Sequence, residues 1–144
     1  MRISTKGKYA IKLMLDLATY YNGEPVKIKD IARRQGISEK YLEQIVSILN
    51  KASLVRSSRG AKGGYRLAAP PETYTIGKIL RATEGDLASF DCAEINGEGC
   101  ENRERCVTVR IWKRLDDAIN GVLDDIRLSD LLDWQNELID QYII

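Results

Sequence analysis

Three cysteines are the residues of this chain whose type and spacing most directly indicate chemistry. Cys92, Cys100 and Cys106 lie in one polar segment, DCAEINGEGCENRERC, at residues 91–106. An odd number of cysteines, in a chain whose first residues do not resemble a signal peptide, argues against a disulfide framework. Soft thiolate ligands that lie close together in sequence favour an iron-sulfur cluster or zinc. The segment is therefore predicted to form a metal site.

The residues around these cysteines favour a loop over a core. Isolated cysteines are most often small buried hydrophobic residues. Here Gly99, Glu101, Glu104 and Arg105 flank the last two thiols, and a stretch this polar is costly to bury. Gly97 and Gly99 also allow the backbone to bend.

The bulk composition limits the classes of function that remain. With 144 residues, of which 44% are hydrophobic and 30% charged, the chain fits one domain with a real core. It has no histidine, so neither a Ser-His or Cys-His catalytic pair nor a His-bound zinc can form. The sequence also lacks C-x-x-C, P-loop and dinucleotide-binding motifs. We therefore expect a binding protein and not an enzyme.

Positive and negative charges are separated along the chain. Residues 1–81 carry sixteen Lys and Arg against six Asp and Glu, a balance of +10, whereas residues 82–144 carry six against fifteen, a balance of −9. A basic front half predicts binding of a polyanion. Double-stranded DNA is favoured over a membrane surface because no basic amphipathic segment with exposed aromatic residues occurs. Lys12 and Asp16 interrupt the N-terminal apolar run, so we expect a cytoplasmic protein without a membrane span.

The front half has the periodicity of three helices. The first begins near Ser4 and buries residues that recur every three or four positions: Tyr9, Ala10, Leu13, Met14 and Leu17. A short amphipathic helix around Ile28 and Ile31 then meets Gly36, which favours a left-handed turn. Ser38 caps the next helix, whose predicted buried face is Leu42, Ile45, Val46 and Leu49.

Two short helices joined by a tight glycine turn are typical of a helix-turn-helix, whose second helix enters the DNA major groove by its N-terminal end. The candidate DNA contacts at that end are Ser38, Glu39, Lys40, Tyr41 and Gln44. Lys40 suits phosphate or guanine, and Gln44 suits adenine. A carboxylate, at Glu39 or Glu43, accepts from cytosine and otherwise repels phosphate, so Glu43 is a candidate for selectivity. An ordinary helical hairpin is the alternative interpretation.

A basic hairpin follows this helix. Leu54 and Val55 begin one strand, residues 65–67 run back, and glycines at positions 60, 63 and 64 allow the bends. Such a hairpin is typical of the wing of a winged helix. Its tip residues Arg59, Gly60 and Lys62 are predicted to reach the DNA backbone or a narrow minor groove.

The back half is predicted to be helical. Thr75 caps a helix that buries Ile76, Ile79 and Leu80. From about Arg103, an apolar stripe continues for more than twenty residues: Val107, Ile111, Leu115, Ala118, Ile119, Val122 and Ile126. A stripe this long is too extensive for a small domain to bury alone and predicts a partner helix. A last helix over residues 128–144, capped by Ser129, offers Leu131, Leu132, Leu138 and Ile139 to the same seam.

Taken in this order, the segments resemble the IscR-type (Rrf family) winged-helix regulators over nearly the whole chain. The resemblance rests on MRISTKGKYAIKLMLDLA, SEKYLEQIVSILNKASLV, RGAKGGYRLA, TIGKILRATEG and the three-cysteine segment. It implies a mainly α (α+β) fold, a winged helix-turn-helix with a β-hairpin wing and a long C-terminal dimerisation helix. Residues 1–81 would bind DNA, residues 82–106 would hold the cluster, and residues 107–144 would form the dimerisation and C-terminal helices.

The resemblance also implies a function, which is a homodimeric transcription regulator that binds an operator and senses iron-sulfur cluster status. Cys92, Cys100 and Cys106 match the three cluster thiolates of the family. A [2Fe-2S] cluster and control of cluster assembly genes are favoured, and [4Fe-4S] is the alternative cluster. The alternative functions are a thiol- or zinc-dependent winged-helix repressor, connected with redox or cysteine metabolism, and a nitric oxide sensor of the same family.

The match to the family fails at the fourth cluster ligand. Some members resembled here use a histidine three residues after the last cysteine, where this chain has Val109. Some nitric oxide sensors use an aspartate from the first helix of the partner subunit, where this chain has Lys8. A carboxylate, a water, a backbone group or a small thiol must then supply the ligand. The nearby carboxylates are Asp91, Glu94, Glu98, Glu101 and Glu104.

Overall fold

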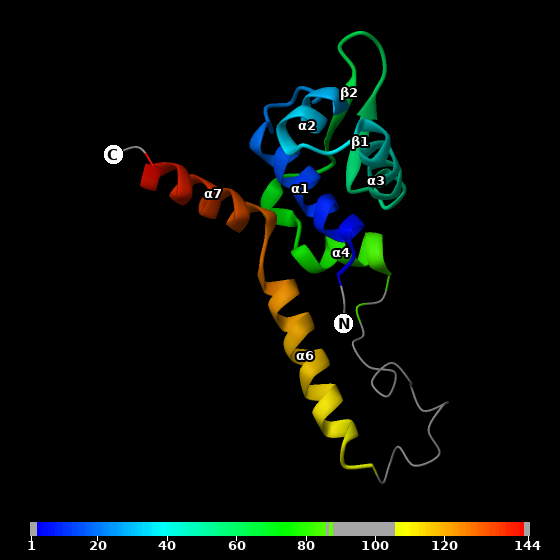
Figure 1. Ribbon diagram of the computed structural model, residues 1–144, viewed down its shortest axis with the longest axis vertical. Coiled ribbons are helices and arrows are strands. Elements are labelled where there is room, and N and C mark those ends of the chain that lie inside the picture. Colours follow the sequence, from blue (N-terminus) through cyan, green and yellow to red (C-terminus); the bar gives the residue numbers. More distant parts are fainter. Residues whose placement is uncertain (1–2, 86, 88–105, 143–144) are drawn as a thin grey trace.

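The computed structural model describes residues 3–85, 87 and 106–142 of the chain. Along the sequence its elements are α1 (Thr5–Thr19), α2 (Ile28–Gln35), α3 (Glu39–Lys51), β1 (Val55–Ser58), β2 (Gly64–Leu67), the 3-10 helix η1 (Pro71–Thr73), α4 (Ile76–Glu84), α6 (Val109–Asp125) and α7 (Leu128–Tyr142). The first four helices and the hairpin gather into one module, from which α6 and α7 project (Figure 1). Helices with one small antiparallel sheet confirm the predicted fold class.

Helix α1 is the centre of the core. It begins where Ser4 caps it, with the Ser4 side chain accepting a hydrogen bond from the backbone N–H of Gly7. It contacts α2, α3, α4, β2 and α7. The apolar face predicted from the sequence is buried at Ala10, Leu13, Met14 and Leu17, whereas Tyr9 lies half-buried at its edge. Because α1 contacts both the helix-turn-helix (α2 and α3) and the C-terminal helix α7, it connects the two ends of the chain.

The predicted helix-turn-helix is present. Gly36 ends α2 in the left-handed conformation at φ 65°, where a side chain would add strain. Ser38 then caps α3 by accepting from the backbone N–H of Tyr41 at 3.2 Å. The buried face of α3 consists of the four residues expected from the sequence, which are Leu42, Ile45, Val46 and Leu49.

The predicted wing is also present. Strands β1 and β2 pair antiparallel, with Val55 opposite Leu67 and both side chains buried in the core. A buried tyrosine fixes the base of the hairpin. The hydroxyl of Tyr74 donates to the carbonyl of Leu54 at 2.8 Å and accepts from the N–H of Ala69 at 2.9 Å. Burial raises the pKa of this phenol.

Helix α6 is shorter than the apolar stripe predicted. It runs for 17 residues from Val109 to Asp125, or about 26 Å, so Val107 precedes it and Ile126 follows it. The part of the prediction that began at Arg103 lies outside the described residues. None of the residues of α6 is buried. The side chains of Ile111, Leu115 and Val122 are 51%, 42% and 58% exposed.

Helix α7 begins at Leu128, as expected, but Ser129 is its second residue and not its cap. The carboxylate of Asp130 instead accepts from the backbone N–H of Arg127 at 2.8 Å, which satisfies the start of the helix. Leu131 and Leu132 pack against the core of the same chain, whereas Leu138 and Ile139 are exposed. One half of the predicted seam therefore packs on the core of its own chain, and the other half is left exposed to solvent. In the described part of the chain, no helix is long and apolar enough to cross a membrane.

Candidate nucleic-acid interface and metal centre

The N-terminal end of α3 presents its candidate DNA-contacting residues to solvent. Ser38, Glu39, Lys40 and Gln44 are exposed, and so is Glu43, the candidate for selectivity. Ser38 is also the helix cap, so its oxygen already serves the backbone. The first two turns of α3 thus expose a cation, an amide and two carboxylates, which have the chemistry for reading base edges.

Tyr41, the aromatic candidate at this end, packs against a second aromatic ring from α1. Tyr41 lies half-buried, with its ring edge-on to the ring of Tyr9 at a centroid distance of 5.7 Å. The ammonium of Lys12 lies 5.6 Å from the Tyr9 ring centroid. Such edge-to-face contacts orient an aromatic side chain. The sequence predicted Tyr41 but not the contact with Tyr9, because the two rings come from different helices.

The wing supplies the second set of candidates. Arg59, Gly60 and Lys62 are exposed at the tip of the hairpin, which extends beyond the helices of the module (Figure 1). Gly60 has a φ of 99°, so the tip needs a glycine there. The candidate residues are thus divided between a helix end and a hairpin tip of one module. This is the arrangement in which a helix and a wing contact neighbouring DNA grooves.

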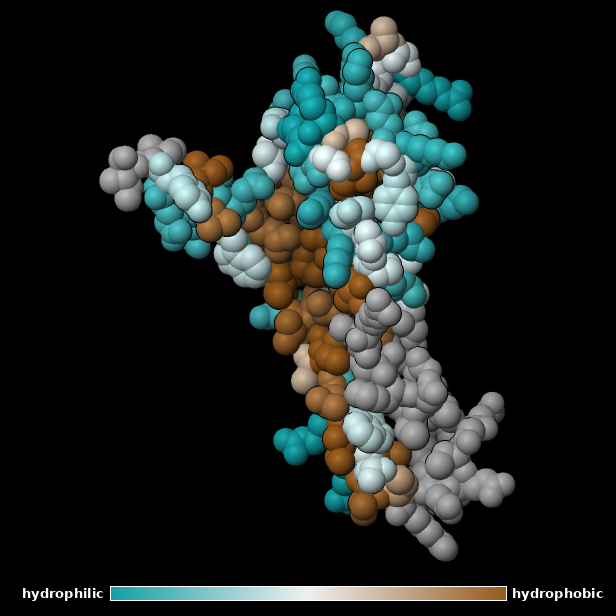
Figure 2. All heavy atoms as spheres, in the orientation of Figure 1, coloured by the Kyte–Doolittle hydropathy of each residue, from teal (hydrophilic) through white to brown (hydrophobic). Residues whose placement is uncertain are grey.

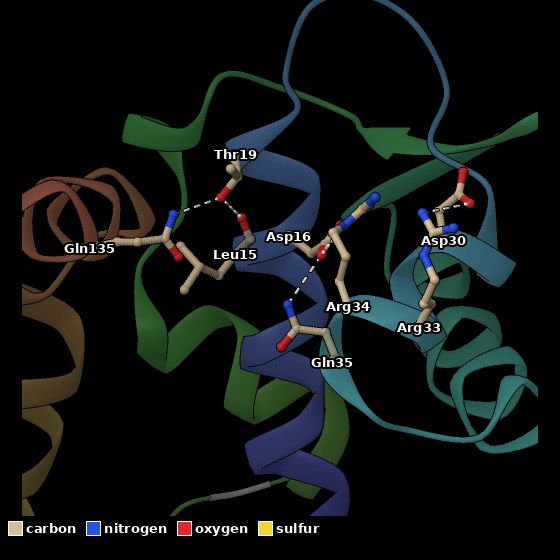
Figure 3. Close-up of polar contacts among 8 residues, drawn as sticks. All are labelled: Leu15, Asp16, Thr19, Asp30, Arg33, Arg34, Gln35 and Gln135. Carbon is tan, nitrogen blue, oxygen red and sulfur yellow. Dashed lines mark hydrogen bonds and ion pairs between the residues drawn. The ribbon is translucent and has the colours of Figure 1, made fainter. Parts of the chain in front are cut away.

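An ion pair between a buried aspartate and a partly exposed arginine holds the helix-turn-helix on α1, and sequence reasoning missed it. Asp16 on α1 is 3% exposed and accepts from Arg34 Nε at 3.0 Å and Nη2 at 2.7 Å (Figure 3). Gln35 Nε2 donates to the same carboxylate at 3.1 Å, and the Arg34 guanidinium lies 4.1 Å from the Tyr20 ring centroid. The hydrogen bond to Asp16 raises the pKa of Arg34. The sequence did contain one signal for this ion pair, because Asp16 lies on the apolar face of the first helix, where a carboxylate needs a partner.

Two contacts tie α4 to its neighbours just before the cysteine segment. The Glu84 carboxylate accepts from both the backbone N–H and the hydroxyl of Ser4, at the start of α1. The Arg81 guanidinium forks onto Asp124 of α6 at 2.6 and 3.0 Å. This hydrogen bond lowers the pKa of Asp124. The end of α4 is therefore joined to both α1 and α6.

Cys106 is the one predicted cluster ligand that lies within the described residues. It lies half-buried three residues before α6, and a hydrogen bond of 2.9 Å joins its Sγ to the Thr108 hydroxyl. That hydrogen bond, with the backbone N–H groups of Thr108 and Val109, lowers the pKa of the thiol. Cys92 and Cys100 lie outside the described residues. Within residues 3–85, 87 and 106–142, no group of three or more Cys, Asp or Glu could hold a metal ion.

Known proteins with similar sequences agree with this arrangement. A family model described as Rrf2, iron-dependent transcriptional regulator, matches residues 3–134. The chain belongs to the Rrf2 family. Two relatives named HTH-type transcriptional regulator IscR are each 42% identical to it. The one from Aliivibrio salmonicida aligns over 92% of this chain and 77% of its own length. The one from Vibrio vulnificus aligns over 97% and 82%.

Solved structures of Rrf2 regulators share the fold. CymR, the global cysteine regulator of B. subtilis, is 40% identical with a TM-score of 0.78, covering 93% of this chain and 98% of its own. IscR of T. potens is 42% identical with a TM-score of 0.77, covering 96% and 90%. These relatives are transcription regulators and not enzymes. The chain is accordingly an IscR-type transcription regulator with a winged helix-turn-helix.

Proposed function

We propose that this Rrf2 protein binds operator DNA as a homodimer and that an iron-sulfur cluster held by Cys92, Cys100 and Cys106 sets its affinity. The observation that carries the DNA-binding part is the exposed N-terminal end of α3 together with an exposed basic wing tip on the same module. Ser38, Glu39, Lys40, Tyr41 and Gln44 would contact the major groove, with Glu43 adding selectivity, and Arg59, Gly60 and Lys62 would contact the backbone or minor groove.

The exposed face of α6 supports the homodimer. Figure 2 shows hydrophobic side chains running from the core down the length of α6. They include Val107, Ile111, Leu115 and Val122, all more than two-fifths exposed. A second copy would cover this face and place two recognition helices on one DNA duplex, with half-sites about 34 Å apart. Residues 1–81 would then read DNA and residues 107–144 would pair the subunits.

Cys106 has the properties of a cluster ligand. Its lowered pKa favours the thiolate, which is the form that binds metal. Two further thiolates in residues 82–106 complete a soft donor set that suits iron and sulfide. The IscR names of the relatives support an iron-sulfur cluster. The resemblance of the sequence to the IscR-type regulators favours [2Fe-2S], and [4Fe-4S] is the alternative. When bound, the cluster supplies a group that oxidation, nitric oxide or iron shortage can alter.

The contacts of α4 could transmit a change in the cysteine segment to the helix-turn-helix. Glu84 is the last residue of α4, seven residues before the cysteine segment begins at Asp91, and it holds the cap of α1 through Ser4. Arg81, one turn earlier, holds Asp124 of α6. A change in the segment that displaces α4 would therefore alter the position of α1 relative to the dimer helix. Such a displacement regulates only if the two states differ in affinity for the operator.

Anaerobic purification tests the proposal. Protein isolated without oxygen should be coloured and should contain iron and sulfide, and a variant with all three cysteines changed to Ser should lose both. Gel shifts of the cluster-loaded and cluster-free forms on an operator should give different affinities. Colourless protein that takes up neither iron nor sulfide, with unchanged gene control by the serine variant, would refute the cluster.

A second candidate is a thiol-dependent regulator that carries no iron. The similarity to CymR, the global cysteine regulator of B. subtilis, supports a connection with cysteine metabolism. Zinc would prefer four tetrahedral ligands, often from close C-x-x-C pairs, which this sequence lacks. Iron-free protein whose DNA affinity responds to oxidation of its thiols would establish this candidate. Response of the cluster-loaded form to nitric oxide alone would make the chain a nitric oxide sensor instead.

A further inference from the structure

An open groove of about 400 Å³ lies between the start of α2 and the wing. Lys27 and Lys29 line one wall, and Ser57, Ser58 and Arg59 line the other. Apart from Arg59, these residues do not belong to the DNA contacts predicted from the sequence. Hydrophilic side chains cover the end of the molecule where α2 and the wing meet, at the top of Figure 2.

The two walls of this groove are held at a fixed distance. Val26, one residue before the cap of α2, pairs with Tyr65 of β2 through two backbone hydrogen bonds of 2.7 and 2.8 Å. Gly64 makes this approach possible, since a Cβ at that position would lie 2.4 Å from the carbonyl oxygen of Val26. The start of α2 and the wing therefore behave as one unit, and the groove is preformed.

The charge of the groove is positive and uncompensated. Its cationic side chains are those of Lys27, Lys29 and Arg59, and none of them forms an ion pair within the described part of the chain. Asp30, the acidic residue next to them in sequence, pairs with Arg33 at 3.5 Å. Ser57 and Ser58 are consecutive residues of β1, so their side chains point to opposite faces and one hydroxyl is available to the groove. Three cations and a hydroxyl around an open groove match a phosphate group in charge and in hydrogen bonding.

We propose that this groove binds the DNA backbone, and specifically the strand that separates the major groove read by α3 from the groove reached by the wing. The site rests on the proposed DNA binding and extends it to Lys27 and Lys29. Arg59 belongs to both the groove and the wing tip, so the bound strand is continuous with the predicted contacts. Because these are backbone contacts, they add affinity without reading sequence.

The test is the salt dependence of DNA binding by Lys27→Ala and Lys29→Ala variants of the full chain. Each lost phosphate contact should reduce the slope of log Kd against log salt by about 0.9 for every subunit on the DNA and weaken binding about eightfold per subunit at 0.1 M salt. The loss should be equal for operator and scrambled duplexes. Lys51→Ala is the matched control, because Lys51 is an exposed lysine at the C-terminal end of α3, away from the N-terminal end that is proposed to enter the major groove.

Four results decide between the outcomes. A reduced slope for both groove variants, with a wild-type slope for Lys51→Ala, supports the groove. Wild-type slopes for the groove variants overturn it while leaving DNA binding intact. A wild-type chain that binds no duplex at low salt overturns the proposed function as well. Tight binding of inorganic phosphate by the wild type, lost in the groove variants without any change in DNA affinity, would assign the groove to a small free anion and also overturn the proposal.

Discussion

Replacing Arg34 with Met should destabilise the protein far more than the same change at its neighbour Arg33. Both arginines lie in the last turn of α2 and both pair with an aspartate (Figure 3). The side chains of Asp16 and Arg34 are 2% and 26% exposed, whereas those of Asp30 and Arg33 are 39% and 76% exposed. Loss of Arg34 would leave the Asp16 carboxylate buried with Gln35 as its remaining side-chain donor.

The expected cost follows from these exposures. Removing one partner of a fully buried ion pair costs about 3–5 kcal/mol, and the partial exposure of Arg34 reduces this to about 2–3 kcal/mol. For a chain of this length, that corresponds to a fall in Tm of about 6–12 °C. The Arg33→Met control should change the free energy of unfolding by less than about 0.5 kcal/mol, because its ion pair is exposed to solvent.

Urea denaturation at one fixed protein concentration measures both variants, and fixing the concentration matters for a protein that dimerises. The double variant Asp16→Asn with Arg34→Met should be more stable than the sum of the single effects predicts, by about 1 kcal/mol or more. Equal stabilities for Arg34→Met and Arg33→Met, or a coupling energy near zero, would show that this ion pair does not hold the helix-turn-helix on α1.

Three further predictions concern other contacts of the fold. Gly64→Ala should lower the free energy of unfolding by about 1–3 kcal/mol and weaken DNA binding, since the added Cβ must displace Val26; thermal melts and gel shifts that match wild type would contradict this. Tyr74→Phe removes a buried hydroxyl with two partners and should cost about 1–2 kcal/mol in urea denaturation. Asp124 has a folded-state pKa below its ordinary value of 3.8, so its stabilising contact with Arg81 is complete above that pH and is lost as pH falls through the folded-state value. The stability difference between wild type and Asp124→Asn, at most about 1 kcal/mol at pH 7 because the pair is half exposed, should therefore shrink progressively in urea titrations as the pH is lowered below 3.8.

The helix-turn-helix could be predicted because its signals are local. The four buried residues of α3 recur at helical spacing, and Gly36 and Ser38 mark the turn and the cap by their own backbone preferences. The tip of the wing could also be predicted from the sequence, because a glycine marks a bend and Gly60 adopts a positive φ there. Each of these features depends on residues only a few positions apart.

The ends of the C-terminal helices could not be predicted in the same way. The apolar stripe continues through Ile126, yet α6 ends at Asp125 because the backbone there pairs with a distant segment. The N–H of Ile76 donates to the carbonyl of Ile126 at 2.9 Å, and the N–H of Leu128 donates to the carbonyl of Tyr74 at 2.9 Å. These bonds set the start of α7 one residue before Ser129, and helical periodicity contains no signal for them.

Residue types alone predicted a basic module that binds DNA and a three-thiol metal site, and they determined that the chain has no histidine for catalysis. The tertiary structure alone decided that Arg34 meets Asp16 across 18 positions and that Glu84 meets Ser4 across 80. It also placed Lys27 and Lys29 opposite the wing. The physical reason is that charge and ligand chemistry belong to single side chains, whereas a contact between distant segments depends on how all the helices pack together.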